Sequence, residues 1–343
     1  MIYSDEQPGD DPRATRLREQ GHTVDVRSVP VSRSRPGQRW PLRALRMGRA
    51  YARAAAASAS RARYDRLIVP TSPPFVHAFA LARAAVTREP VTLLHHDLFP
   101  QNARVAGLGG PAPLFDLAEA MGARLAGRAD RHETLSRPME RRLRRTRGED
   151  APVEVVPIPT DERLAPVPRE HNRWIAEHDL RDKFVVMYAG NLGRMYDFAP
   201  LLDAAQALAD RDDIAFALVG TGFHEDRLRD EIHRRRLDNV KLLPAVPNER
   251  LAELLCAGDL HVVPLIPGAI DVMWPHKIDN LLRLDRPTLA LGFDPDLDGV
   301  ETVAAEALAD RIEAAKNEIT VPSPPSSQEG GLGGQVPPPR QRT

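Results

Sequence analysis

The chain has 343 residues, of which 42% are hydrophobic and 28% are charged, and its formal net charge at pH 7 is -1. This composition is typical of a soluble globular protein and excludes a largely disordered chain, and the length suffices for two domains that each bury a core. The near-zero net charge excludes an overall attraction to nucleic acid, and the single cysteine, Cys256, excludes an intramolecular disulfide framework.

Short apolar runs alternate with helical patterns along most of the chain. The predicted strands are residues 23–26, 66–69, 91–94, 153–156, 184–189, 214–219, 240–243, 260–263 and 288–291. The predicted helices are residues 13–20, 42–60, 76–86, 114–127, 138–146, 197–209, 225–235, 248–257, 276–284 and 303–318. Strands that alternate with helices predict parallel sheets covered on both faces.

Proline-rich residues 157–168 predict the connection between two domains, an amino-terminal one at 1–160 and a carboxyl-terminal one at 161–320. Residues 321–343 are rich in proline, glycine and serine. They cannot bury enough apolar surface to fold, so we expect a disordered tail.

The sequence favours a cytoplasmic protein. A single cysteine suits a reducing compartment, no apolar run reaches the roughly 20 residues that span a bilayer, and no signal-peptide pattern is visible. A basic helix leaves peripheral membrane contact open. Arg43, Arg46, Arg49 and Arg53 share one helical face, which is either a solvated surface or a contact with anionic lipid at the inner membrane surface.

Asp97 follows the apolar strand at 91–94 and precedes Pro100. Ligands of parallel α/β sheets lie at the carboxyl ends of strands, where a carboxylate can orient an acceptor hydroxyl or take up its proton. The alternative is a turn cap before the proline. His95 and His96 are adjacent in the strand pattern and point to opposite faces, so they do not form a metal-binding pair, and we predict no metal site.

A strand, a glycine turn and a helix start occur together in the second domain. The run at 184–189 ends at Gly190-Asn191-Leu192-Gly193-Arg194, and Asp197 can cap the helix that follows. Backbone N–H groups at such a turn suit a phosphate, although glycines also close many ordinary strand–helix turns. Gly220 and Gly222 follow the next strand, and the same two interpretations apply to them.

Lys277 follows Pro275 at the start of a predicted helix. A cation at that end opposes the helix dipole, so helix stability gives little reason for its presence. Lysine acts as a point charge for an anion, while Arg194, beside the glycine turn, can bind a phosphate through two bonds. The alternative for Arg194 is a solvated arginine at a helix start.

Further motifs follow in a characteristic order. They are Arg13 with Gly21-His22-Thr23-Val24, Thr71-Ser72-Pro73-Pro74, His96-Asp97-Leu98-Phe99-Pro100, Leu135-Ser136 with Met139, the loop at 188–193, Val219-Gly220-Thr221-Gly222, Asn239-Val240, Asp259 with Val263-Pro264-Leu265, and Pro275-His276-Lys277-Ile278 with Arg286-Pro287. Their order and spacing over residues 3–291 resemble the GT-B glycosyltransferases of family 4, close to those that build bacterial surface polysaccharides.

The resemblance implies an α/β fold of two Rossmann-like domains whose parallel sheets face each other across a cleft. The first domain would bind the acceptor, which would be a glycan, a lipid-linked molecule or another small molecule. The second domain would bind a UDP- or GDP-sugar as the donor. Transfer would be metal-independent, with retention at the anomeric carbon, and would need no cofactor and no nucleic acid. The implied catalytic residues are Asp97, Arg194 and Lys277, and the implied donor-binding residues are Gly190, Asn191, Gly193, Gly220, Gly222 and Asn280.

Three departures from the family pattern bear on activity. Asn280 stands where a glutamate usually holds hydroxyls of the donor, and asparagine lacks the charge that strengthens such a bond; Asp285 stands where glycine is usual. Only Met1 and Ile2 precede the segment 3–9, so we expect the first, central strand to be missing. After Leu291, only the helical pattern at 303–318 stands where the family has a further unit and a helix crossing back.

These departures leave alternatives to an active transferase open. One is a catalytically degenerate GT-B homologue that binds a partner in a glycan-assembly system. A GT-B sugar-nucleotide epimerase is a second, since Asp97 and His96 could serve acid–base chemistry, although the segment 275–287 resembles the transferases more. A nicotinamide-dependent Rossmann enzyme is disfavoured, because no G-x-G-x-x-G motif opens the first βαβ unit.

Overall fold

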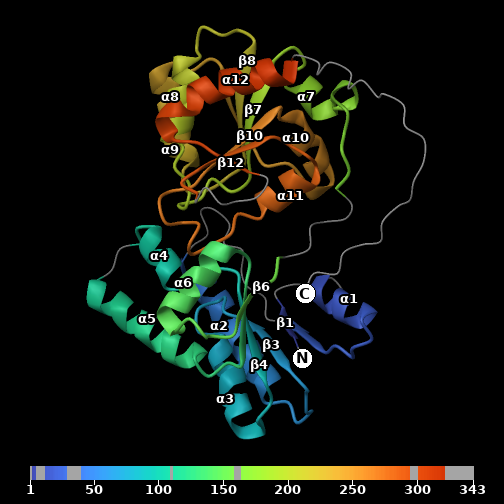
Figure 1. Cartoon of the computed structure of the whole chain (residues 1–343), viewed down its shortest axis with the longest axis vertical. Helices are drawn as coiled ribbons and strands as arrows, with labels where there is room; N and C mark the ends of the chain where they lie inside the picture. Colours follow the sequence, from blue (N-terminus) through green and yellow to red (C-terminus); the bar gives the residue numbers. More distant parts are fainter. Residues whose placement is uncertain are drawn as a thin grey trace, which may run out of the picture.

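The computed structural model describes residues 2–4, 12–28, 40–108, 111–157, 164–293 and 300–320. This part of the chain forms two domains, each built on a parallel sheet of six strands (Figure 1). The α/β class and the two parallel sheets predicted from the alternating patterns are confirmed. The predicted tail, 321–343, lies outside the described residues, as do residues 158–163 of the predicted connection.

The first domain places its strands in the order β2-β1-β3-β4-β5-β6, and neighbouring strands are parallel. Every residue of β4 is buried, as expected of an apolar strand covered on both faces. The elements are β1 (Ile2–Ser4), α1 (Pro12–Glu19), β2 (Val26–Ser28), α2 (Trp40–Ser58), β3 (Leu67–Pro70), α3 (His77–Thr87), β4 (Val91–His95), α4 (Gln101–Val105), α5 (Ala112–Ala126), β5 (Arg131–Thr134), α6 (Arg137–Arg147) and β6 (Val153–Val155).

The expectation that the first strand is missing is wrong. Ile2–Ser4 form β1 in the interior of the sheet, where Ile2 pairs with Val26 of β2 and with Ile68 of β3. A strand of three residues carries too little periodicity for a sequence pattern to reveal it. Its backbone groups nevertheless complete the hydrogen-bond ladders of both neighbours.

The second domain places its strands in the order β12-β11-β10-β7-β8-β9, again in parallel. Every residue of β7 and β8 is buried, so these strands hold the loops that follow them firmly in place. The elements are η1 (Arg169–His171), α7 (Arg173–Glu177), β7 (Phe184–Ala189), α8 (Ala199–Ala207), β8 (Ile214–Val219), α9 (Glu225–Arg235), β9 (Val240–Leu243), η2 (Asn248–Arg250), α10 (Leu251–Ala257), β10 (Leu260–Pro264), α11 (Lys277–Arg283), β11 (Thr288–Leu291), β12 (Glu301–Thr302), η3 (Ala305–Ala307) and α12 (Leu308–Thr320).

The last described helix, α12, stays with the second domain. Leu308, Ile312 and Ala315 are buried in the core of that domain, and Glu313 forms an ion pair with Arg211 just before β8. Figure 1 shows α12 beside α8, on the side of the second domain remote from the first. This helix therefore does not make the crossing that the family pattern has near its end.

The two domains meet through the segment between β10 and α11. The N–H of Leu98, just after β4, donates to the carbonyl of Val272 at 2.8 Å, and Asp97 forms an antiparallel bridge with Met273. Both bonds tie the end of β4 to the loop that leads to Lys277. An apolar cluster from both domains surrounds the contact and consists of Leu98, Leu135, Met139, Leu143, Val153 and Val272.

The basic helix predicted at 42–60 is α2. Of its four predicted arginines, Arg49 and Arg53 are exposed, whereas the side chains of Arg43 and Arg46 lie outside the described residues. Within the described ranges, no helix has both the length and the apolar character needed to cross a membrane. Contact of α2 with a membrane surface stays a prediction.

Candidate functional site

Two glycine turns lie against each other at the carboxyl edge of the second sheet. Gly190 and Gly220 follow β7 and β8 with φ angles of 133° and 151°, which residues with side chains rarely adopt. The N–H of Gly190 donates to Val219 at 2.9 Å, and a Cβ on Gly220 would lie 1.8 Å from the carbonyl oxygen of Gly190. The second position therefore requires glycine because the backbones approach too closely for any side chain.

Lys277, the first residue of α11, reaches back to the Gly190 turn. Its Nζ lies 3.0 Å from the place that a Cβ on Gly190 would occupy. It also lies 3.6 Å from the centre of the Tyr188 ring and 4.4 Å from that of Tyr196, whose π-clouds attract a cation. Within the described part of the chain, this buried Nζ has no hydrogen-bond partner. Burial lowers the pKa of Lys277 well below its ordinary value.

The amine of Lys277 adjoins a cavity of about 220 Å³ beside the two turns. Its apolar wall comes from Leu251, Leu254 and Leu255 of α10 and from the segment after β9. Apolar walls with a few polar groups are typical of small-molecule sites. Four residues that the sequence predicts as site residues line this one cavity: Gly190, Gly220, Lys277 and Asn280.

The other predicted residues of the turns lie beside this cavity. A Cβ on Gly193 would lie 2.7 Å from Asn191 Nδ2, and one on Gly222 would lie 2.7 Å from Asn191 Oδ1, so both glycines make room for the Asn191 amide. Arg194 is exposed, and its guanidinium carbon lies 3.3 Å from the centre of the Phe223 ring. The structure thus stacks Arg194 on an aromatic ring and does not place it in the cavity lining with Lys277.

Asp97 lies where the first domain touches the loop that carries Lys277. Burial raises the pKa of Asp97, and nearby His276 opposes that rise. Burial, and to a smaller extent the Asp97 carboxylate, also raises the pKa of Tyr196 to about 12. Asp97 and Lys277 therefore approach the same tyrosine from different domains, and a carboxylate of raised pKa is a stronger base.

The two departures near Lys277 have different structural consequences. Asn280 lies one helical turn after Lys277 and presents an amide to the same cavity. Its neighbour Asp279 accepts a hydrogen bond from Trp274 Nε1 at 2.9 Å and so supports the preceding loop. Asp285 has a φ angle of 51°, the left-handed conformation for which glycine is usual and which aspartate tolerates better than most residues.

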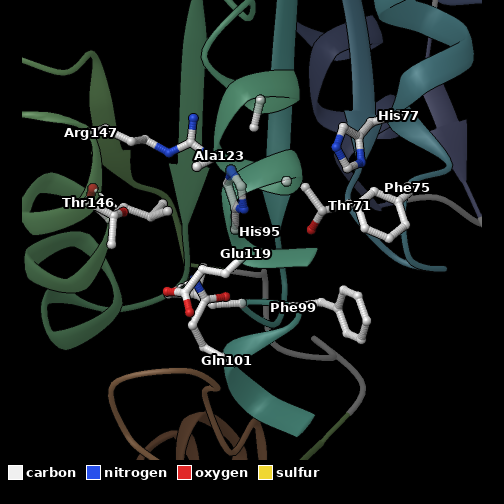
Figure 2. Close-up of a pocket in the computed structure, with 14 residues that line it drawn as sticks. Thr71, Phe75, His77, His95, Phe99, Gln101, Glu119, Ala123, Thr146 and Arg147 are labelled. Carbon is white, nitrogen blue, oxygen red and sulfur yellow. Dashed lines mark hydrogen bonds between the residues drawn. The ribbon is translucent and has the colours of Figure 1, made fainter. Parts of the chain in front are cut away.

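A second polar group lies inside the first domain (Figure 2), and of its members only His95 was weighed as a metal ligand from the sequence. His95 Nε2 lies 3.1 Å from His132 Nδ1, and Arg147 Nη1 lies 3.4 Å from His132 Nε2. His77, at the start of α3, lines the same small cavity as His95 and Arg147. No sequence signal connects these residues, because they come from four separate elements. Among the described residues, no group of three or more His, Cys, Asp or Glu side chains is arranged to hold a metal ion.

Two family models match the chain, one on each domain. The model of glycosyltransferase family 4 matches residues 13–164, and that of group 1 glycosyl transferases matches residues 170–267. The chain is 35% identical over 107 residues to Escherichia coli K12 WcaI, named as a glycosyl transferase of colanic acid biosynthesis. It is 27% identical over 238 residues to Pseudomonas aeruginosa WbjE, named as a glycosyltransferase. These matches cover 31% and 68% of this chain, but only 26% and 58% of the two relatives.

Solved structures show the same fold. Anabaena HepE in complex with UDP-glucose superposes with a TM-score of 0.64 at 16% identity, covering 93% of this chain and 90% of that one. WaaG, a glycosyltransferase of lipopolysaccharide biosynthesis, gives a TM-score of 0.57 at 14% identity and covers 89% of this chain and 85% of its own. At these identities the likeness establishes the two-domain GT-B fold and nothing finer.

Proposed function

Because this chain belongs to the GT-B glycosyltransferases of family 4, we propose that it moves a sugar from a nucleotide-sugar to an acceptor with retention at the anomeric carbon. The acceptor is a glycan, a lipid-linked or another small molecule, held by the first domain. The second domain holds the donor in the cavity beside Gly190 and Gly220. Transfer proceeds without a metal ion or a cofactor.

The single observation that carries this proposal is the position of Lys277. An amine that is buried without a hydrogen-bond partner in the described chain is costly unless an anion joins it. The backbone turn at Gly190 lies beside that amine and suits a phosphate. The diphosphate of a nucleotide-sugar carries the charge that this place lacks, and the apolar wall of α10 suits the base or ribose.

The proposed reaction breaks the bond between the anomeric carbon and the diphosphate oxygen and forms one to the acceptor oxygen on the same face of the sugar. Negative charge develops on the departing diphosphate, and Lys277 stabilises it there. The acceptor hydroxyl gives up its proton to Asp97, whose raised pKa makes it a suitable base. Asn280 holds a hydroxyl of the donor. Arg194 reaches the diphosphate only if it leaves the Phe223 ring.

The donor we propose is a UDP- or GDP-sugar, and the solved complex of HepE with UDP-glucose favours the uridine nucleotide. The names of WcaI and WaaG favour a surface polysaccharide or glycolipid as the product. We propose that the reaction takes place at the cytoplasmic side, as the single cysteine favours, with the exposed arginines of α2 as a surface for peripheral contact with the inner membrane.

Isothermal titration of the purified protein with UDP- and GDP-sugars tests the donor site. We expect one nucleotide class to bind, with Lys277→Ala weakening it by about 10- to 100-fold through loss of a charge-assisted bond. Lys316→Ala, on α12 in the same domain, is the matched control and should bind like the unmodified protein. The proposal would be refuted if the folded protein bound no nucleotide-sugar, or if Lys277→Ala left the affinity for the nucleotide-sugar unchanged.

Asn280 favours a second candidate, a catalytically degenerate GT-B homologue that binds a partner in a glycan-assembly system. An amide accepts a weaker hydrogen bond than the usual carboxylate, so the protein could have kept donor binding and lost the transfer reaction. Release of free nucleotide from a UDP- or GDP-sugar, lost in Lys277→Ala, would eliminate this candidate. Nucleotide binding without any turnover, over a panel of acceptors, would favour it over the transferase.

A further inference from the structure

The first domain contains a largely buried arginine that no carboxylate of the described residues neutralises. Arg147, the last residue of α6, directs Nη1 toward His132, and its Nε is buried without a hydrogen-bond partner in the described part of the chain. Among the described residues, no Asp or Glu forms an ion pair with its guanidinium. Burial lowers the pKa of Arg147 to about 10, which still leaves it positively charged at pH 7.

The three histidines near Arg147 are neutral at pH 7. Burial lowers the pKa of His77 to about 4 and that of His132 to about 3, and it lowers the pKa of His95 well below its ordinary value. The direction of the hydrogen bonds assigns their tautomers. Arg147 donates to His132 Nε2, so His132 carries its proton on Nδ1 and donates to His95 Nε2. His95 then keeps its own proton on Nδ1.

Arg147, His77 and His95 line a cavity of about 40 Å³ at the carboxyl ends of β3 and β4, and His132 lies behind His95 and Arg147. One ordered water needs roughly 10–15 Å³ on this measure, so the cavity holds about three waters or one small group such as a carboxylate or a phosphate. Figure 2 shows Arg147 and His77 on opposite sides of the cavity with His95 between them. His77 is only 5% exposed, and neither ring nitrogen has a partner in the described chain.

Glu119 is the one carboxylate among the described residues that line this cavity, and it is already engaged. Gln101 donates to Glu119 Oε1 at 2.9 Å, and Arg104 Nη2 lies 4.0 Å from Oε2. In Figure 2, Glu119 and Gln101 lie together at the edge remote from Arg147 and His77. The cavity therefore offers the positive charge of Arg147 and neutral N–H donors of His95 and His77, while the one carboxylate of its described lining, Glu119, is held at another edge by Gln101.

We propose that this cavity is a subsite for an anionic group of the acceptor, a carboxylate or a phosphate, bound by Arg147 with His77 and His95 as additional donors. The inference rests on the proposed transfer function, in which the first domain holds the acceptor. An acidic sugar or a lipid-linked phosphate supplies such a group, whereas a neutral hexose does not. The subsite thus selects acceptors by charge, through bonds that a guanidinium makes well with planar or tetrahedral oxyanions.

Isothermal titration of the full-length protein saturated with UDP tests the subsite with two matched pairs of probes. Methyl glucuronide is compared with methyl glucoside, and geranyl phosphate with geraniol. We expect one anion to bind about 10- to 100-fold more tightly than its neutral match, and the pair that responds identifies the source of the anion. Arg147→Gln should remove this preference and leave UDP affinity unchanged, while Arg145→Gln, exposed on the same helix, should change neither.

Equal affinity for anion and neutral match in both pairs would overturn the subsite, as would an Arg147→Gln variant that keeps the preference. If Arg147→Gln loses UDP binding through misfolding, Arg147→Met decides, because it keeps an unbranched side chain and removes the charge. Retained UDP binding with a weakened preference for the anion supports the subsite, and an unchanged preference rejects it. A protein that binds the anion but no nucleotide would contradict the donor site instead.

Discussion

Replacing Gly190 by alanine separates the cost of an unusual backbone conformation from the cost of disturbing Lys277. At a φ angle of 133°, a Cβ costs about 1–3 kcal/mol of folding free energy. The new methyl would also lie 3.0 Å from Nζ and 3.2 Å from Cε of Lys277, which is closer than ordinary van der Waals contact. Because these atoms end a flexible side chain, the lysine gives way and its amino group leaves the turn.

The magnitude for donor binding follows from what the ammonium group contributes. A hydrogen bond to a charged group is worth about 1.5–3 kcal/mol, so Gly190→Ala should weaken UDP binding by about 10- to 100-fold. The matched control is Gly21→Ala in the first domain, where φ is 86° and no atom of the described residues lies within 4 Å of the added Cβ. It should lose about 1 kcal/mol of stability and bind UDP normally.

Urea unfolding and isothermal titration of both variants give the two quantities separately. Equal UDP affinity in Gly190→Ala and Gly21→Ala would refute the reasoning, because the added methyl at Gly190 would then not displace Lys277 from the donor. A loss of affinity in both variants would show that general destabilisation, rather than displacement of Lys277, controls binding.

Three further predictions concern charge. Burial lowers the pKa of free Lys277, and a bound diphosphate restores its positive charge. UDP binding should therefore take up a proton at pH values above that lowered pKa and tighten as pH falls toward it. Titrations over a pH series, each in two buffers of different ionisation enthalpy, measure the uptake, and zero uptake at every pH contradicts the prediction. Asn280→Glu should tighten UDP-sugar binding about 3- to 10-fold, since a charged acceptor makes the stronger bond; weaker binding would assign Asn280 another role. In the first domain, the Arg83 hydrogen bond is the main cause that lowers the pKa of buried Glu89 from 4.5 to about 2. The stability this pair contributes is complete above pH 4.5 and is lost as pH falls toward 2. Glu89→Gln should therefore lower the free energy of unfolding by about 3–5 kcal/mol at pH 7. In urea unfolding, the stability of this variant should also fall less steeply than that of the unmodified protein as the pH is lowered below 4.5. If both proteins lose stability with the same slope, another group is responsible for the acid dependence.

The approach of Lys277 to Gly190 could be predicted from the sequence because two constraints act together. Loops that follow parallel strands meet at one edge of the sheet, and a lysine at a helix start serves the helix poorly. Both statements need only the alternation of strands and helices and the position of Pro275. The prediction that Lys277 lies near Gly190 therefore needed no knowledge of side-chain packing.

Other features depended on contacts that no local pattern encodes. Arg194 stacks on Phe223 because the loop after β8 brings that exposed ring beside it, and a motif cannot state which ring an arginine will find. The contact of Lys277 with the rings of Tyr188 and Tyr196 could not be predicted either, because Tyr196 follows β7 only through an irregular turn. The neutral histidines around Arg147 come from distant strands and helices, and burial rather than spacing gives them their character.

The segment between β10 and α11 connects the proposed donor and acceptor sites through the backbone. At its start, the N–H of Ile266 donates to Met195 at 3.0 Å beside the glycine turn. In its middle, Val272 accepts a hydrogen bond from Leu98 and Met273 forms a bridge with Asp97. The segment ends where α11 begins, at Lys277. A diphosphate bound by Lys277 and an acceptor bound by Asp97 therefore both contact residues that are attached to one short, hydrogen-bonded segment. Any change in acceptor affinity that the donor causes through this segment must be matched by an equal change in donor affinity caused by the acceptor.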